Sequence, residues 1–175
     1  YRVYMSKFSI VLCVLCFFAA SSTQAKKASL AEISRYLDQH KVLTAKFAQI
    51  SYDGSRADGK IFLKRPGRLR FEYQDPNNVV VLVAEKRITI FDYKSDSQPT
   101  SYPVSNSPLS LLLDDEIDFT KDSMVLDHSY DGSLTRVTLN NPEHQEFGQI
   151  TLMFEQDPLR LSQWQVTNQV GEQIL

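Results

Sequence analysis

Beyond its first 25 residues the sequence contains no cysteine, because Cys13 and Cys16 both fall in an apolar run near the start. The remainder therefore has neither a disulfide framework nor thiol chemistry. The cysteine of a lipoprotein-processing site follows a small residue, whereas Leu12 and Leu15 precede these two. We therefore expect that the chain is not itself lipidated.

An excess of positive charge is also missing. Without Arg2 and Lys7, which lie in the first 25 residues, 17 basic residues face 21 acidic ones, a formal charge near −4. Proteins that bind nucleic acids normally present a dominant basic face. We therefore expect no nucleic-acid partner. The basic cluster Lys60, Lys64, Arg68 and Arg70 is either a solvated strand face or a docking patch for acidic partners or headgroups.

Motifs of catalysis and metal binding are scarce. The three histidines, His40, His128 and His144, lack metal-ligand spacing, and the sequence has no glycine-rich phosphate loop. Asp127-His128-Ser129 contains the residue types of a catalytic triad, but on a strand His128 would point away from both neighbours. The acidic run 114–118 lacks the glycine and alternating ligands of a calcium loop. We expect no enzyme, no metal and no cofactor.

Residues 1–25 have the composition of a targeting segment. Met5 is the expected natural start, so residues 1–4 would be a non-native extension. The apolar run 8–20 is shorter than the roughly 20 residues that cross a membrane. Thr23-Gln24-Ala25 offers small residues to a signal peptidase. We expect cleavage after this tripeptide and export; an uncleaved membrane anchor is the alternative.

The part that follows is long enough for one domain with one core. No internal repeat or linker divides it, so we expect residues 26–175 to form a single domain. A strand that begins at Glu172 stops with the chain.

Two segments are predicted to be helical. Ser29 and Glu32 form a capping-box pattern that opens a helix reaching about His40. Ser107-Pro108 begins a second, very short and apolar helix, which must dock on a sheet or a ligand because isolated helices of that length are unstable.

Most of the remaining sequence alternates between apolar and polar residues with a period of two. The clearest hairpin is 60–73, whose strands meet at Pro66-Gly67. In the strand that starts near residue 43 the phase changes, which predicts a bulge near Phe47-Ala48. Successive hairpins predict a curved antiparallel sheet or barrel.

Arg65 is the exception to this alternation, because it falls in phase with Ile61 and Leu63 on the apolar side. An unpaired buried guanidinium costs several kcal/mol, so Arg65 must find acceptors. The last carbonyls of the second helix, around Leu112 and Leu113, lack intrahelical partners and carry the negative end of its dipole. Arg65 would bind these carbonyls and hold the helix; pairing with an acid such as Asp92 is the alternative.

Five motifs, in order, give the sequence a family resemblance: Phe47-Ala48-Gln49, Gly59 to Gly67, Arg70 to Tyr73, Ser107 to Leu113, and Leu161 to Trp164. This series resembles the LolA family of periplasmic outer-membrane lipoprotein carriers and covers nearly all of residues 26–175. The resemblance implies a mainly β fold, an incomplete, unclosed antiparallel β-barrel with a helical lid. It also implies that Arg65 acts as the lid latch. Because members of the family usually continue further, it implies that the domain is truncated at its C-terminus. Leucines at Leu69 and Leu109, where other members carry aromatic residues, leave the acyl-chain preference open.

The expected function follows from the resemblance. The chain would carry triacylated lipoproteins through the periplasm of a Gram-negative bacterium as a monomer. It would receive them from the inner-membrane ABC release complex (LolCDE) and deliver them to an outer-membrane acceptor lipoprotein (LolB) or an equivalent. An acceptor or sensor of the same fold is the alternative. The expected lipid-binding cavity is lined by Leu63, Leu69, Phe71, Tyr73, Ile90, Leu109, Leu112, Leu113, Phe154 and Trp164.

Overall fold

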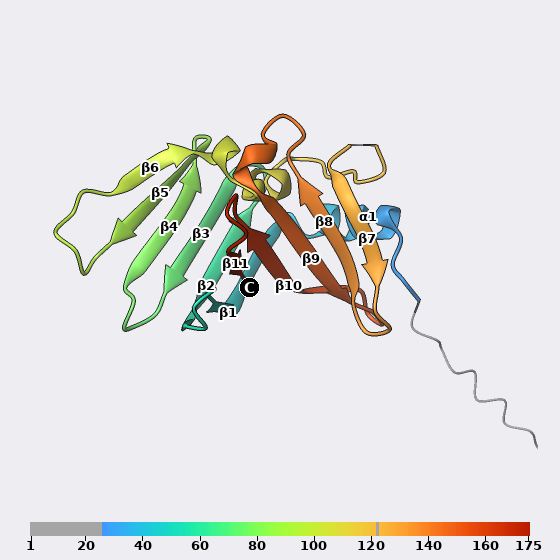
Figure 1. Ribbon diagram of the computed structural model, residues 1–175, viewed down its shortest axis with the longest axis horizontal. Helices are drawn as coiled ribbons and strands as arrows, with labels where there is room; N and C mark the ends of the chain where they lie inside the picture. Colours follow the sequence, from blue (N-terminus) through green and yellow to red (C-terminus); the bar gives the residue numbers. More distant parts are fainter. Residues whose placement is uncertain (1–25, 122) are drawn as a thin grey trace, which may run out of the picture.

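The computed structural model describes residues 26–121 and 123–175, and the expected signal peptide lies outside them. Two antiparallel sheets form the framework of this part (Figure 1). Sheet one has the strand order β1 (Val42–Ile50), β2 (Arg56–Lys64), β3 (Arg68–Tyr73), β4 (Val79–Ala84), β5 (Arg87–Asp92) and β6 (Thr100–Pro103). Sheet two has the order β11 (Gln173–Ile174), β10 (Arg160–Thr167), β9 (Gln149–Glu155), β8 (Thr135–Asn140) and β7 (Val125–Tyr130).

The two sheets meet along one edge only. The backbone N–H of Ile50, at the end of β1, donates to the carbonyl of Leu175 at 2.8 Å, and the Leu175 N–H donates back at 3.0 Å. The opposite edges, β6 and β7, pair with no further strand of the described residues. The fold is therefore mainly β, an incomplete antiparallel barrel, as the family resemblance implied; the structure shows that it stays open between β6 and β7.

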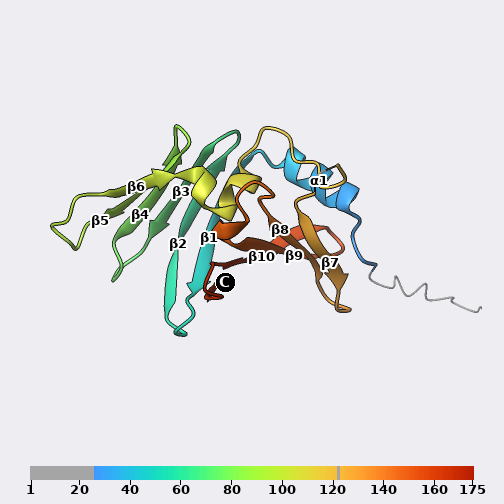
Figure 2. The same cartoon turned by 45° about the horizontal axis from the view of Figure 1, so that its top comes forward.

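Helix α1 (Leu30–Gln39) lies on sheet two (Figure 2). Its capping box is present as predicted: the Ser29 hydroxyl accepts from the Glu32 N–H, and the Glu32 carboxylate accepts from the Ser29 N–H at 2.7 Å. Ile33 is fully buried under the helix. The Tyr36 hydroxyl accepts from the backbone N–H of Leu161 at 3.3 Å, which ties α1 to β10.

The second predicted helix is present as a 3-10 helix, Pro108–Leu112, between β6 and β7. The Ser107 hydroxyl caps it by accepting from the Leu109 N–H at 3.3 Å. We call residues 107–113 the lid and residues 114–119, which continue from it along α1, the strap. Two shorter 3-10 helices are Val104–Asn106 and Gln145–Phe147.

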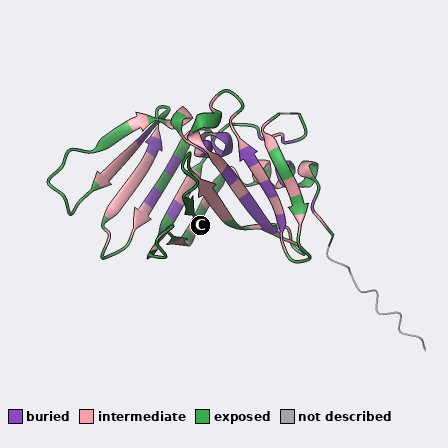
Figure 3. Cartoon of the chain, in the orientation of Figure 1, coloured by how far each residue is buried: buried purple, intermediate pink, exposed green. Residues whose placement is uncertain are grey.

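The buried side chains form two hydrophobic clusters, one on each sheet (Figure 3). Leu109 of the lid and Trp164 of β10 pack against both. The sheet-one cluster consists of Ile61, Leu69, Phe71, Val83, Ile88 and Leu113. The sheet-two cluster consists of Ala28, Ile33, Leu111, Leu112, Ile117, Phe119, Val137, Leu139, Ile150, Leu152 and Phe154.

The predicted bulge near Phe47-Ala48 is wrong. Strand β1 pairs with β2 in unbroken register from Val42 to Ile50, and its residues alternate evenly between more and less exposed. Ala48 and Ile50 lie on the outer, exposed face, so their apolar character does not mark a change of phase.

Gly59 of β2 sits where any side chain would collide. A Cβ there would lie 2.4 Å from the backbone carbonyl oxygen of Glu72 and 2.6 Å from the ring of Phe47. We expect Gly59→Ala to lower the free energy of unfolding by about 1–3 kcal/mol, because overpacking must displace a paired backbone group. Urea denaturation measures the loss.

The control is Gly54→Asn in an open turn, where nothing lies within 4 Å of a new Cβ and the φ of +80° suits asparagine. If Gly59→Ala and this control have the same free energy of unfolding, the result would contradict the close contact between Phe47 and β2.

Candidate functional site

Arg65 follows β2 at the turn into β3, and its side chain is almost entirely buried, with 1% of its surface exposed. One terminal nitrogen of the guanidinium donates to the carbonyl of Asp114 at 3.2 Å, and the other donates to the carbonyl of Leu37. Both reach a carboxylate oxygen of Asp38, at 3.4 and 3.3 Å. The guanidinium thus joins sheet one to the C-terminal end of α1 and to the strap.

The predicted acceptors of Arg65 were close but wrong in detail. The carbonyl of Leu113 accepts instead from the backbone N–H of Gly67, at 2.8 Å, and Arg65 takes the next carbonyl, that of Asp114. The alternative partner was wrong too, since Arg65 pairs with Asp38 and the Asp92 carboxylate accepts from the backbone N–H of Lys94. We call Arg65, Gly67, Leu37, Asp38 and Asp114 the junction.

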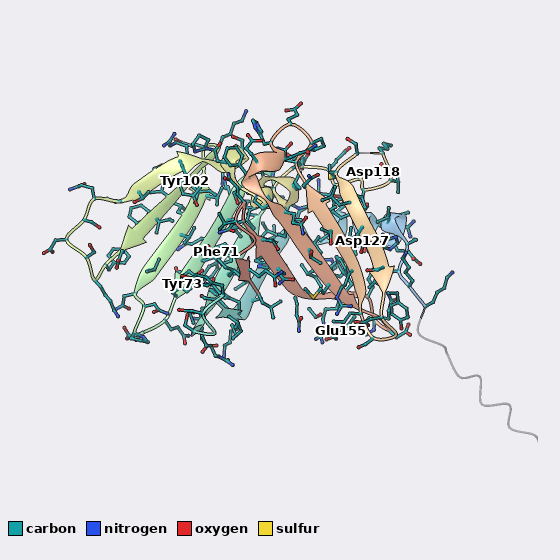
Figure 4. The ribbon with its side chains drawn as sticks, in the orientation of Figure 1. Phe71, Tyr73, Tyr102, Asp118, Asp127 and Glu155 are labelled. Carbon is teal, nitrogen blue, oxygen red and sulfur yellow. The ribbon has the colours of Figure 1, made fainter. Side chains whose placement is uncertain are left out.

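The inner face of sheet one is apolar and only partly covered. Of its predicted ligand-binding residues, Leu69 and Phe71 are buried in the cluster that includes Leu113 of the lid, whereas Leu63, Tyr73 and Ile90 are half-buried. Phe71, Tyr73 and Tyr102 are labelled on this sheet in Figure 4. A half-buried apolar surface under a short covering segment can accept a further apolar ligand by burying more area.

Five half-buried residues that pack on this face were missed by the prediction: Ala45, Phe47, Val81, Tyr102 and Val104. Each packs, half-buried, against the sheet-one cluster. The alternation of β1 already placed Phe47 in phase with Leu43 and Ala45, so that signal was available. Which residues of neighbouring strands align with it depends on the strand register, which the sequence does not show.

Aromatic rings connect this face to sheet two. The ring of Phe47 meets Phe71 and Tyr73 edge-on, with centroids 5.5 and 5.1 Å apart, and Phe71 meets Trp164 of β10 at 6.1 Å. The Tyr73 hydroxyl donates to the Gln49 side chain at 2.6 Å. Burial raises the pKa of Tyr73, so its hydroxyl stays neutral and the face carries no charge there.

The remaining predicted binding residues divide between the two clusters. Leu113 belongs to the sheet-one cluster, and Leu109 and Trp164 contact both. Leu112 and Phe154 instead belong to the sheet-two cluster, where Phe154 is fully buried and meets Tyr36 of α1 edge-on at 5.9 Å. Phe154 is therefore closed off by α1 in this conformation, and its contact with a ligand stays a prediction.

The groups considered for catalysis and metal binding have structural partners. The Nε2 of His128 lies 2.8 Å from the Ala28 carbonyl, while the Ser129 hydroxyl donates to Asp127 at 2.8 Å. Within residues 26–121 and 123–175, no group of three or more His, Cys, Asp or Glu side chains is placed to hold a metal ion. In the same part of the chain, no helix is long and apolar enough to cross a membrane.

The basic cluster lies on the outer face of sheet one. Lys60, Lys64, Arg68 and Arg70 are all exposed, and Arg70 forms an ion pair with Glu72 at 2.7 Å. These cations therefore face away from the lid and the inner apolar face.

Comparison with known proteins identifies the family. The family model described as "Outer membrane lipoprotein carrier protein LolA" matches residues 38–175. The chain belongs to the LolA family. The matched region runs from Asp38 at the end of α1 and contains both sheets, Arg65, the lid and the strap.

Individual LolA relatives are distant. A protein of Azotobacter vinelandii named outer-membrane lipoprotein carrier protein is 32% identical over 93 residues, which cover 50% of this chain and 45% of that protein. A protein of the same name from Coxiella burnetii is 23% identical over 171 residues, covering 93% and 80% of the two chains. The solved LolA superfamily protein NE2245 from Nitrosomonas europaea has a TM-score of 0.44 at 14% identity, covering 83% of this chain and 74% of that one.

The two clusters should differ in how much stability each side chain contributes. We expect Phe154→Ala to lower the free energy of unfolding by about 3–5 kcal/mol, because the ring is fully buried. Ile90→Ala should cost about 1–2 kcal/mol, because Ile90 is only half-buried on the open face. Paired urea denaturation curves measure both. Equal losses would mean that the inner face of sheet one is as tightly covered as the core under α1.

Proposed function

We propose that this chain is a periplasmic carrier that binds the acyl chains of lipoproteins and moves them from the inner to the outer membrane. The observation that supports the proposal most directly is the half-buried apolar face of sheet one, partly covered by a short lid whose next residue, Asp114, is bonded by a buried arginine. Each methylene group buried on such a face contributes about 0.8 kcal/mol, so acyl chains alone provide ample affinity.

The open side of the barrel suits this cargo. The lid lies between β6 and β7 in the sequence, and its contacts with sheet one are few: Leu109, Leu113 and the backbone bond from Gly67 to Leu113. Outward movement of the lid would withdraw Leu109 and Leu113 from the sheet-one cluster and expose more of this face. Acyl chains would then take the place of the lid leucines against the same surface, while the protein part of the cargo remains in water.

In this mechanism Arg65 is the latch of the empty carrier. Its bonds to α1 and the strap stabilise the closed conformation, which competes with acyl binding. A carrier must give up its cargo as well as take it, so closure supplies part of the free energy of release. The apparent affinity for cargo is therefore lower than that of a permanently open face. The chain hydrolyses nothing in this scheme, and the energy for loading comes from the ABC release complex.

The carrier proposal is tested with the chain from residue 26 onward, incubated with inner-membrane vesicles that contain triacylated lipoprotein and are supplied with ATP. We expect lipoprotein to appear in the soluble fraction as a one-to-one complex with the chain. Vesicles without ATP serve as the control. If lipoprotein stays in the membrane although the chain is folded by circular dichroism, the carrier proposal is wrong.

The latch is tested by Arg65→Leu. Without the guanidinium the closed conformation loses its charged bonds, so the open conformation is more populated. We expect the variant to load lipoprotein normally and to transfer it to the acceptor at least about tenfold more slowly, which corresponds to about 1.4 kcal/mol. The measurement is the rate of transfer to acceptor-containing liposomes.

Arg68→Leu is the matched control, since Arg68 lies three residues further along the same hairpin on its exposed outer face. Normal transfer by Arg65→Leu, or equal slowing by both variants, would count against the latch.

A further inference from the structure

Asp38 occupies a position that helix electrostatics disfavours. It is the last residue but one of α1, whose final turn contains no basic residue. The C-terminal end of a helix carries the negative end of the dipole, so a carboxylate there is destabilising unless a cation compensates it. The cation comes from elsewhere in the fold, because Arg65 of sheet one reaches the Asp38 carboxylate at 3.3 Å.

One carboxylate oxygen of Asp38 serves two different segments. It accepts hydrogen bonds from both terminal nitrogens of Arg65. It also accepts one from the backbone N–H of Ile117 in the strap, at 3.0 Å. One helical turn earlier, the Ser34 hydroxyl accepts from the backbone N–H of Phe119, at 2.9 Å. Residues 34 and 38 lie on the same side of α1, and alternate residues 117 and 119 present their N–H groups to it.

These bonds make α1 and the strap one unit that belongs to sheet two. Ile117 and Phe119 are 4% and 1% exposed and pack in the sheet-two cluster beside Ile33. The Ala28 N–H, just before α1, donates to the Thr135 hydroxyl of β8 at 3.0 Å. Whereas this unit packs on sheet two through apolar side chains, the junction joins it to sheet one through hydrogen bonds and one ion pair.

Burial makes Arg65 depend on Asp38. The Arg65 side chain is 1% exposed and that of Asp38 is 36% exposed, so water reaches the carboxylate but not the guanidinium. The other acceptors of Arg65, the carbonyls of Leu37 and Asp114, are neutral. A buried cation with only neutral acceptors is strongly disfavoured relative to one with a counter-ion.

We propose that Asp38 is a positioning residue of the latch: it supplies the counter-ion that lets Arg65 be buried and ties that ion pair to the strap. The inference rests on the carrier function proposed above. When the latch opens, Arg65 therefore detaches from the combined α1–strap unit. The charge of Asp38 contributes to cargo release, although Asp38 need not touch the cargo. The sign of the effect is diagnostic, because loss of Asp38 would tighten acyl binding, whereas a merely structural defect would weaken it.

The test uses a triacylated lipopeptide with a dansyl group, whose emission is excited by energy transfer from Trp164, the single tryptophan of the sequence. Asn at position 38 keeps an acceptor for the Ile117 N–H but has no charge. We expect Asp38→Asn to slow lipopeptide release about tenfold and to tighten the apparent Kd by a similar factor, as expected for loss of a charged hydrogen bond. Asp38→Glu, which keeps the charge, should recover part of the wild-type rate.

The matched control is Glu116→Gln, which removes an exposed carboxylate of the same strap and should change release less than twofold. In the double variant Asp38→Asn with Arg65→Leu, release should match that of Arg65→Leu alone within about twofold, because the two residues act as a pair. Additive effects, weaker binding by Asp38→Asn, or behaviour equal to that of the control would overturn the proposal.

The two proposals fail in different ways. If the wild-type chain and every variant leave the lipopeptide unbound, the carrier function fails and this inference fails with it. If the wild type binds while Asp38→Asn matches Glu116→Gln, only the role of Asp38 is wrong. Should Asp38→Asn fold poorly, Asp38→Glu and the coupling between positions 38 and 65 in urea denaturation decide the question.

Discussion

A buried guanidinium needs acceptors, and this single requirement explains how three distant segments of the chain meet. Arg65 follows β2 on the apolar side of sheet one, where it cannot remain unpaired. Its acceptors are two backbone carbonyls and one carboxylate, drawn from the end of α1 and the start of the strap. The position of the lid over sheet one therefore depends on the burial of one charge as well as on contacts between leucines.

The buried charge of Arg65 is important because the barrel is open. Sheet two has α1, the lid and the strap over its inner face, and its central side chains are fully buried. Among the described residues, the inner face of sheet one is covered by the lid, Val104 and Trp164, and Tyr73 and Ile90 remain half-exposed. One half of the molecule is thus a conventional core and the other half is a surface that gains stability when something apolar covers it. The junction lies between the two halves.

Several features of the site were readable in the sequence for local reasons. The Arg65-Pro66-Gly67 turn, the capping box at Ser29 and the capped start of the lid each depend on residues within a few positions of one another. The burial of Arg65 was readable too, because strand alternation gives the side of every residue in a strand. The bulge was wrong because alternation alone does not say that Ala48 and Ile50 can stay exposed near a strand end.

The sequence by itself determined the class of fold, the boundaries of α1, the place of the lid and the need of Arg65 for a partner, since these depend on short-range pattern and on the cost of burying charge. Only the tertiary structure decided which groups accept the hydrogen bonds of Arg65. Asp38 lies 27 positions away from Arg65 and Asp114 lies 49 positions away. The packing of α1 on sheet two brings both acids to the turn after β2. The tertiary structure also places Phe154 against Tyr36 of α1 and Phe71 against Trp164 of β10, because strand register and helix docking, which are properties of the whole chain, decide what covers each apolar residue.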